Sequence, residues 1–267
     1  MDKNEIKELL REYRNNYEEI NLDEVFILTK EAMMYIGDTD PVLRDNLVYP
    51  YIEYVIGHDL LKPDEVRAIA QICLNNIALK GKKIDDSIFS RTFSMLIIGS
   101  VISFHRKHSI FSLSELQDIF NQVIDSYQSD FDVRGYINKK GWAHGAAHGA
   151  DTLSQFALLD EFNSEMLMRI LYAIQKKSTI SYYGYIHNED DRMARAAVAV
   201  IKRKKLSESK IFGWLQRFRV KKENSYSYII RQHNIRGLLS CIYFRLFGDE
   251  RYQKYTQEIA KIIISNN

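Results

Sequence analysis

The sequence predicts an all-α protein, an irregular helical-repeat stack of antiparallel helix pairs with roughly ten to twelve helices. Only three prolines and twelve glycines interrupt the 267 residues, so long stretches of chain contain no residue that breaks a helix. Helix start signals recur along the chain, whereas no stretch alternates apolar and polar residues as a half-buried strand would. Amphipathic helices joined by short loops pack as antiparallel pairs, and a series of such pairs stacks into a repeat. A compact irregular bundle is the alternative.

N-cap residues, capping boxes and prolines in the first helical turn mark the expected helix starts. In the first half of the chain these signals place starts at Asp40-Pro41, Lys62-Pro63, Asp85 or Asp86, and Ser112. In the second half, helices are expected from Asn163 or Ser164 and over residues 188–205, 207–219, 225–247 and 249–264. Gly81 is expected to end the second of these helices, and Ile102 the third.

The sequence shows no sign of division, export or membrane insertion. No linker rich in Gly, Ser or Pro divides the chain, so we expect a single helical-repeat domain over residues 1–267. Cys73 and Cys241 lie far apart in apolar stretches, which favours two buried thiols in a reducing compartment. Residues 1–21 lack the apolar segment of a signal sequence, and the apolar run at residues 93–104 is shorter than the about twenty residues that cross a bilayer. We therefore expect a cytoplasmic protein with no membrane insertion.

One segment near the middle of the chain places chemically active side chains at helical spacing. At 100° per residue, His144, His148 and Asp151 fall within about 60° of one another on one face of an expected helix. Gly145 and Gly149 each cost roughly 1 kcal/mol relative to alanine in a helix interior. Close approach of another helix or of a ligand is expected to offset that cost.

Three interpretations of this face stay open. Two imidazoles at positions i and i+4 can reach one ion, so a divalent metal bound by His144 and His148 is a candidate cofactor, with Asp151 orienting an imidazole. Without a metal, His148 hydrogen-bonded to Asp151 would be a catalytic base, with His144 or Arg134 facing an anionic substrate. The third interpretation gives these side chains a structural role, as hydrogen-bonding partners of a neighbouring helix.

Further candidate ligand-binding residues flank this face: Asp132, Arg134, Trp142 and Arg91. Trp142 is expected on the opposite, core side of the same helix. Asp132 and Arg134 are expected to pair across a loop. Arg91 lies among apolar residues, where a lone charge is costly. We expect a buried ion pair with Asp45 or Asp132, and an arginine that lines a pocket is the alternative.

The motifs in this part of the chain resemble those of a known family. They are the run Asp132-x-Arg134-Gly135-Tyr136 followed by Lys140-Gly141-Trp142-Ala143-His144-x3-His148-Gly149-Ala150-Asp151, together with Asp38-x-Asp40-Pro41-x2-Arg44-Asp45 and Phe89-Ser90-Arg91-x-Phe93-Ser94. With these motifs the chain resembles the uncharacterised bacterial family called domain of unknown function 2785. The resemblance extends over nearly the whole chain and implies an armadillo/HEAT-like helical fold. It implies no activity.

Positive charge is concentrated toward the end of the chain. Residues 202–245 contain twelve Lys or Arg and two Glu, a net charge of +10, so the remainder carries −8 of a total of +2. Aromatic residues are interleaved with these cations, a combination that suits a phosphate backbone and stacked bases. The candidate polyanion-binding residues are Lys204, Lys205, Arg217, Arg219, Lys221 and Lys222. In the alternative interpretation the cations complement helix ends or face solvent, and the aromatic rings belong to the core.

The sequence therefore leaves three classes of function open. The first is a helical-repeat binding protein for an unknown protein partner or a small anionic ligand. The second is a metal-dependent or acid–base enzyme that acts on an anionic small molecule, and the third is a nucleic-acid or polyanion binder. The first class is favoured because stacked helices expose extended surfaces and the chain lacks a complete catalytic set.

Overall fold

The computed structural model describes residues 1–78 and 84–266, which are about 70% helical with almost no strand. The all-α prediction is confirmed, and the 12 helices fall within the expected range when α3, the turn after it and α4 are counted as one. The chain forms two compact units, Met1–Thr152 and Leu153–Asn267. The expectation of one domain over residues 1–267 stays a prediction.

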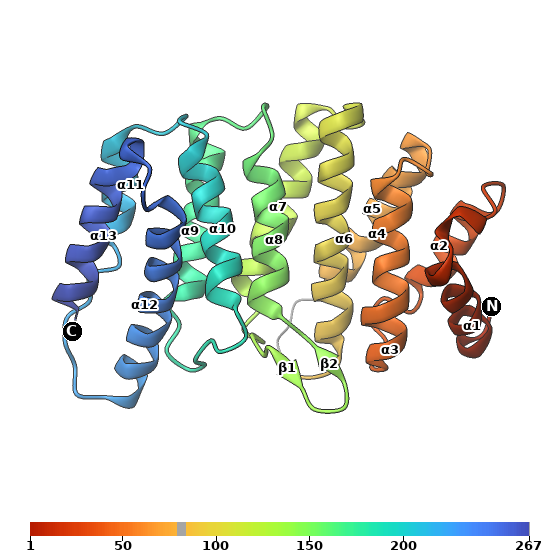
Figure 1. The fold of residues 1–267 in the computed structure, drawn as a ribbon, viewed down its shortest axis with the longest axis horizontal. Helices are drawn as coiled ribbons and strands as arrows, with labels where there is room; N and C mark the ends of the chain where they lie inside the picture. The colour runs from red at the N-terminus through yellow and green to blue at the C-terminus, as the bar shows by residue number, and fades with distance from the viewer. Residues whose placement is uncertain (79–83, 267) are drawn as a thin grey trace. The chain divides into compact units, whose positions relative to one another are not determined.

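The first unit consists of successive helices packed on one another and one short hairpin (Figure 1). Its elements are α1 (Lys3–Asn15), α2 (Val25–Met33), α3 (Pro41–Leu43), a π-helical turn (Arg44–Val48), α4 (Tyr49–Gly57), α5 (Pro63–Ile77), α6 (Ser87–His108), α7 (Leu113–Ser129), β1 (Tyr136–Ile137), β2 (Gly141–Trp142) and the start of α8 (Gly145–Ala157). Helix α5 packs against α6 and α7, and α4 packs against α6. Helix α6 therefore packs against both α4 and α5.

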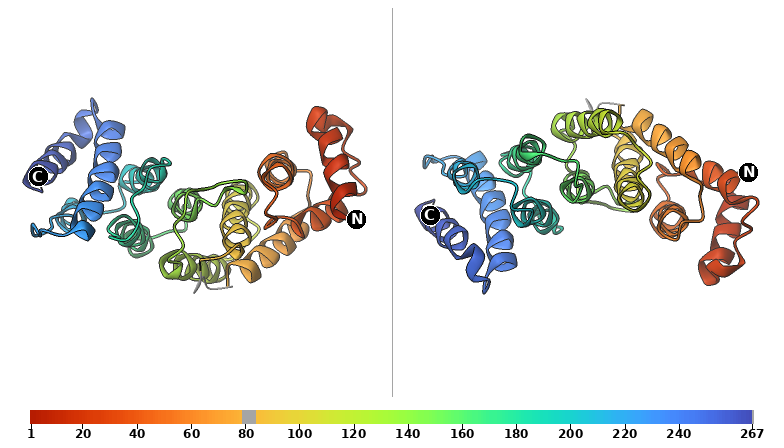
Figure 2. Two further views of the ribbon diagram at one scale, coloured as in Figure 1. Left: turned by 90° about the horizontal axis from the view of Figure 1, so that it is seen from below. Right: turned by 90° about the horizontal axis from the view of Figure 1, so that it is seen from above.

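The second unit contains the end of α8 and five further helices. They are α9 (Ser164–Ser178), α10 (Glu189–Lys202), α11 (Glu208–Gln216), α12 (Tyr226–Leu246) and α13 (Gln253–Ser265), which follows a short 3-10 turn at Glu250–Tyr252. Figure 2 shows α9 and α10 side by side and nearly end-on. Helix α10 also packs against α12, and α13 packs against α11 and α12.

The helices begin where side chains can satisfy the free amides of a first turn. Asp40 accepts hydrogen bonds from the amides of residues 42 and 43, and Asn163 caps α9 in the same way. Ser112 and Glu115 form the predicted capping box of α7. Helix α6 continues to His108, beyond the predicted end at Ile102, because its buried side chains continue to that turn. The predicted helix end at Gly81 lies outside the described residues.

Helix α6 is the most apolar element among the described residues. Its length and a mean hydropathy of 1.5 are sufficient to cross a membrane, but 72% of that stretch is buried inside the protein. The core helix of a soluble protein has the same properties. The expectation that residues 93–104 form a buried helix agrees with this burial.

The sequence failed to predict a two-stranded antiparallel hairpin, in which Tyr136 lies opposite Trp142. The placement of Trp142 on the core side of a helix is therefore wrong, because Trp142 lies in β2 with 38% of its surface exposed. His144 also lies outside the helix, since α8 begins at Gly145. The spacing argument assumed one continuous helix, but Gly141 at φ +80° turns the chain before α8 can start.

Candidate functional site

The hairpin is fixed to a buried ion pair that precedes α4. Arg44 is 0% exposed, and its Nε donates to Asp45 Oδ1 at 2.7 Å. Its Nη2 donates to the carbonyl oxygen of Lys140 at 2.6 Å, and the amide of Trp142 donates to Asp45 Oδ2 at 3.3 Å. The ion pair therefore binds the hairpin backbone on both sides of Gly141.

Burial and aromatic rings set the electrostatics of this anchor. Burial lowers the pKa of the Arg44 guanidinium and raises the pKa of the Asp45 carboxyl, although each charge favours ionisation of the other. The guanidinium also lies over the rings of Phe89 and Phe93, 3.9 Å and 4.9 Å from their centroids. A Cβ at Gly141 would lie 2.6 Å from Asp45 Oδ2, so only glycine fits here.

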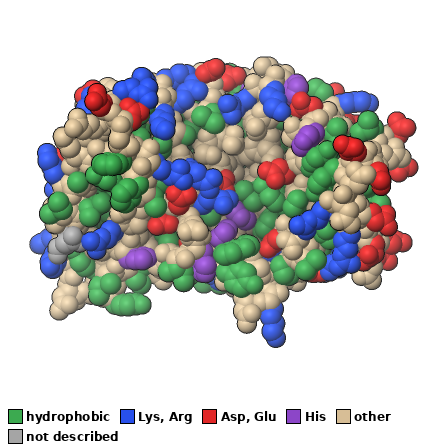
Figure 3. All heavy atoms as spheres, in the orientation of Figure 1, with side chains coloured by type: hydrophobic (Ala, Val, Ile, Leu, Met, Phe, Trp, Pro, Cys, Tyr) green, Lys and Arg blue, Asp and Glu red, His purple; other side chains and the backbone are tan. Residues whose placement is uncertain are grey.

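A series of aromatic rings leads from the hairpin surface into the core. The ring of Tyr136 meets Trp142 edge to face at a centroid distance of 4.9 Å, and Trp142 stacks on His144 at 4.3 Å. His144 meets His148 at 5.2 Å, and His148 meets Phe93 at 4.9 Å. Tyr136 is 50% exposed and His148 only 5%. Figure 3 shows histidine side chains beside hydrophobic ones above the hairpin. We call Tyr136, Trp142 and His144 the hairpin surface.

His144 holds an unusual backbone conformation at the start of α8. Its φ of +46° lies in the left-handed region, which few residues other than glycine adopt, although histidine adopts it more often than most. Its amide donates to the carbonyl of Gly135 at 3.1 Å, and its own carbonyl accepts from the amide of His148 at 3.0 Å. The surrounding hydrogen bonds therefore fix the imidazole beneath Trp142.

The two glycines of α8 are explained by close packing within the first unit. A Cβ at Gly145 would overlap the carbonyl oxygen of Asp132, and a Cβ at Gly149 would overlap the ring of Tyr127 in α7. The hydroxyl of Tyr127 donates to the carbonyl of Ala146 at 3.1 Å, which holds that ring against the helix. The expected close approach is therefore made by the protein itself.

Arg91 forms a buried ion pair, as expected, but with a different partner. Its Nε donates to Asp130 Oδ2 at 2.6 Å, and its side chain is 2% exposed. Neither expected partner pairs with Arg91. Asp132 accepts two hydrogen bonds from the Arg134 guanidinium, at 2.8 Å and 2.7 Å, and Asp45 belongs to the hairpin anchor. The cavity beside Arg91 measures about 10 Å³, so it cannot admit a ligand. The predicted pairing of Asp132 with Arg134 is confirmed.

The structure brings His144 and His148 together but does not supply a metal-binding cluster. Within residues 1–78 and 84–266, no group of three or more His, Cys, Asp or Glu side chains is placed to hold one ion. Zinc sites use at least three protein ligands. Asp151 lies on α8 near Tyr127, whose pKa is raised by burial and further by the charge of Asp151. Among the described residues, His144 and His148 therefore lack the third His, Cys, Asp or Glu ligand that a zinc site uses.

The candidate polyanion-binding residues lie on the surface of the second unit, and several of them bind other residues of that unit. Three bind partners in the second unit: Lys205 Nζ donates to the Asp160 carbonyl at 2.8 Å, Arg217 Nε to Gln175 Oε1 at 2.8 Å, and Arg219 Nη2 to Glu258 Oε1 at 3.1 Å. All six candidate residues, including the three with these partners, are exposed: Lys204, Lys205, Arg217, Arg219, Lys221 and Lys222. Of the aromatic residues interleaved with these cations, Trp214 and Phe218 are 1% and 0% exposed and belong to the core, whereas Tyr226 is 78% exposed.

Sequence reasoning missed Tyr136 and the link between the Arg44–Asp45 ion pair and the hairpin. The sequence did contain a turn signal. Asn138 and Gly141 are turn-forming residues, and they lie between the short segments that contain Tyr136 and Trp142. The link to Arg44 joins residues 96 positions apart, and no local pattern reports such a contact.

Comparison with known proteins gives one match. The model of a family described as "Protein of unknown function (DUF2785)" matches residues 75–244. This range includes the hairpin, α8 and the Phe89–Ser94 motif. It begins after the Asp38–Asp45 motif, so the match covers less of the chain than the resemblance suggested. No curated protein and no solved structure matches the chain.

Proposed function

The chain belongs to the family of proteins of unknown function DUF2785, and we propose that it is a helical-repeat binding protein that recognises a protein partner through the hairpin surface. The observation that carries this proposal is the half-exposed Trp142 ring stacked on His144 at 4.3 Å. Tryptophan and tyrosine dominate the binding energy of many protein interfaces, because they bury a large area at a low entropy cost.

The backbone conformation of His144 places its imidazole beneath the Trp142 ring. A residue other than glycine at φ +46° costs about 1–3 kcal/mol. Glycine would adopt this backbone without strain. Positive φ also occurs at Asp59, Ser109, Lys139, Asn188 and Lys204. The support for recognition therefore comes from the stacking of His144 beneath an exposed indole and not from the backbone conformation alone.

Recognition fits the geometry better than catalysis does. His148, the candidate base, is 5% exposed and lies between the rings of His144 and Phe93. The nearby cations are engaged, because Lys140 Nζ pairs with Asp86 at 2.6 Å and Arg134 binds Asp132. A ligand at this surface would meet mainly aromatic faces, so an anionic substrate is not favoured.

An armadillo-like arrangement in a bacterial, cytoplasmic protein is part of the same proposal. Its support is the packing of successive helices, α5 on α6 in the first unit and α9 on α10 in the second. Stacked helix pairs present extended surfaces on which protein partners bind. Nucleic-acid binding by residues 202–245 is less favoured, because at least three of the six candidate cations make intramolecular hydrogen bonds.

Site-specific crosslinking tests the proposal. A photo-crosslinking phenylalanine analogue replaces Tyr136 in the full chain, which is expressed in its native cells. We expect one discrete adduct, because Tyr136 lies at the edge of the recognition surface. Trp142→Ala should reduce its yield at least tenfold, since truncation of a central aromatic anchor costs about 2 kcal/mol or more.

Tyr226→Ala is the matched control, because Tyr226 is a 78% exposed aromatic residue in the second unit. This variant should leave the adduct unchanged. The proposal is wrong if the adduct persists in Trp142→Ala, or if the same adduct forms when the analogue replaces Tyr226.

A further inference from the structure

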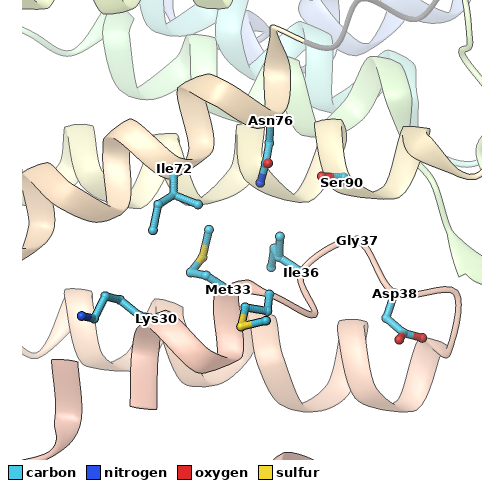
Figure 4. A pocket seen from close by; sticks show the side chains of 9 residues that line it. Lys30, Met33, Ile36, Gly37, Asp38, Ile72, Asn76 and Ser90 are labelled. Carbon is cyan, nitrogen blue, oxygen red and sulfur yellow. The ribbon is translucent and has the colours of Figure 1, made fainter. Parts of the chain in front are cut away.

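The first unit contains a cavity of about 490 Å³ that is separate from the hairpin surface. It lies between the end of α2 with the loop that follows it and the facing sides of α5 and α6 (Figure 4). Its lining residues are Lys30, Met33, Met34, Ile36, Gly37, Asp38, Ile72, Asn76 and Ser90. Its volume is within the range of small-molecule sites.

The floor of the cavity is apolar, and the accessible apolar surface beside it comes from Met34 and Ile72. Met33 and Ile36 approach from one side and Ile72 from the other, as Figure 4 shows. Met33 and Ile36 are 3% and 1% exposed, whereas Met34 is 74% exposed. Methionine side chains are flexible and polarizable, so they adapt to ligands of different shape. This wall suits an aliphatic body.

The two ends of the cavity are polar and differ in charge. Lys30 lies at one end, where its Nζ is 4.7 Å from the centroid of the Phe26 ring, and no carboxylate among the described residues pairs with it. Toward the other end, Asn76 donates to Ser94 Oγ at 2.9 Å, which leaves the amide oxygen of Asn76 available.

Asp38 does not compete for a ligand's positive charge, because it is already neutralised. Lys3 Nζ lies 2.7 Å from Asp38 Oδ1, and the same oxygen accepts the amide of Asp40 at 2.8 Å. Lys30 is therefore the one charge lining this cavity that a ligand can meet, and a complementary ligand carries a negative group at that end.

We propose that this cavity binds an amphiphilic monocarboxylate, with its aliphatic chain against Met34 and Ile72 and its carboxylate at Lys30. The inference does not depend on the hairpin surface. An uncharged molecule of the same shape can pack against the apolar side chains but cannot pair with the Lys30 ammonium. We therefore expect the carboxylate to bind more tightly than the uncharged molecule.

Methyl NMR of the full chain tests this site with octanoate and 1-octanol as probes. The chain contains seven methionines, of which Met33 and Met34 line the cavity. With ¹³C-labelled methionine methyl groups, octanoate should shift these two resonances saturably and leave the other five unchanged. Lys30→Gln should weaken octanoate binding about two- to fivefold, the worth of one exposed charge pair, and should leave octanol binding unchanged.

Lys176→Gln is the matched control, because it removes the same charge from an exposed position on α9. It should leave the binding of both probes unchanged. The assignment is overturned if octanoate shifts neither Met33 nor Met34, or if it shifts all seven methyl groups alike. It is equally overturned if Lys30→Gln and Lys176→Gln weaken octanoate to the same extent, or if Lys30→Gln does not weaken it.

Discussion

At the scale of single residues, the glycines of α8 are fixed by what surrounds them. Helix propensity alone would favour alanine at Gly149 by about 1 kcal/mol. The Tyr127 ring occupies the space that a Cβ would need, and the hydrogen bond from its hydroxyl to Ala146 keeps the ring in place. Packing therefore outweighs propensity at this position.

Gly149→Ala should lower the free energy of unfolding by about 1–3 kcal/mol, the usual cost of overpacking a core. Gly213→Ala is the control, because Gly213 lies within α11 with no atom within 4 Å of an added Cβ. That variant should be neutral or more stable by up to about 1 kcal/mol. Urea unfolding compares the two, and equal effects would show that the approach of Tyr127 does not matter.

At the scale of elements, local chemistry made helix starts predictable and left the hairpin unpredicted. The caps at Ser112 and Asn163 act on amides two or three residues away, so the sequence alone reveals them. The hairpin is fixed by Arg44, which lies 96 residues from Lys140. Contacts of this kind depend on the packing of distant segments, so the positions of Trp142 and His144 were not predictable from helical spacing.

The first turn of α10 contains a buried acid whose ionisation should affect stability. Glu189 is 0% exposed, and burial is the main cause of its raised pKa. Hydrogen bonds from backbone amides and the charge of His187 lower this pKa, whereas the charge of Asp190 raises it further. Its Oε1 lies 3.7 Å from His187 Nδ1, too far for a hydrogen bond. The folded protein therefore holds this proton more tightly than the unfolded chain.

Glu189→Gln should remove this pH dependence. In the wild type, the unfolded chain loses this proton at a pH of about 4.5, and the folded protein loses it only at its higher pKa. Between these two values, each rise of one pH unit lowers the free energy of unfolding by up to about 1.4 kcal/mol. The variant should thus gain stability relative to the wild type across that window, measured by urea unfolding at a series of pH values. Exposed Glu165, in the first turn of α9, supplies the control Glu165→Gln. A constant difference between Glu189→Gln and the wild type at every pH would refute this prediction.

At the scale of the whole molecule, a net charge of +2 does not favour polyanion binding. Fluorescence anisotropy with a labelled DNA duplex should show weak binding that disappears as salt rises from about 50 mM to 200 mM, because few phosphates are neutralised. The double variant Lys221→Glu, Lys222→Glu should remove the weak DNA binding expected at low salt. Binding that stays tight at 200 mM salt would contradict this expectation and restore nucleic acid as a partner.

We propose that the hairpin surface serves recognition and contributes little to folding. The free energy of unfolding of Trp142→Ala tests it, with Phe120→Ala, a 0% exposed residue of the same unit, as the standard for a core aromatic. We predict a loss of about 1–2 kcal/mol for Trp142→Ala, since a half-exposed ring loses mainly its contacts with Tyr136 and His144. Phe120→Ala should lose about 3–5 kcal/mol. A loss for Trp142→Ala as large as that for Phe120→Ala would make Trp142 a structural residue and contradict the claim.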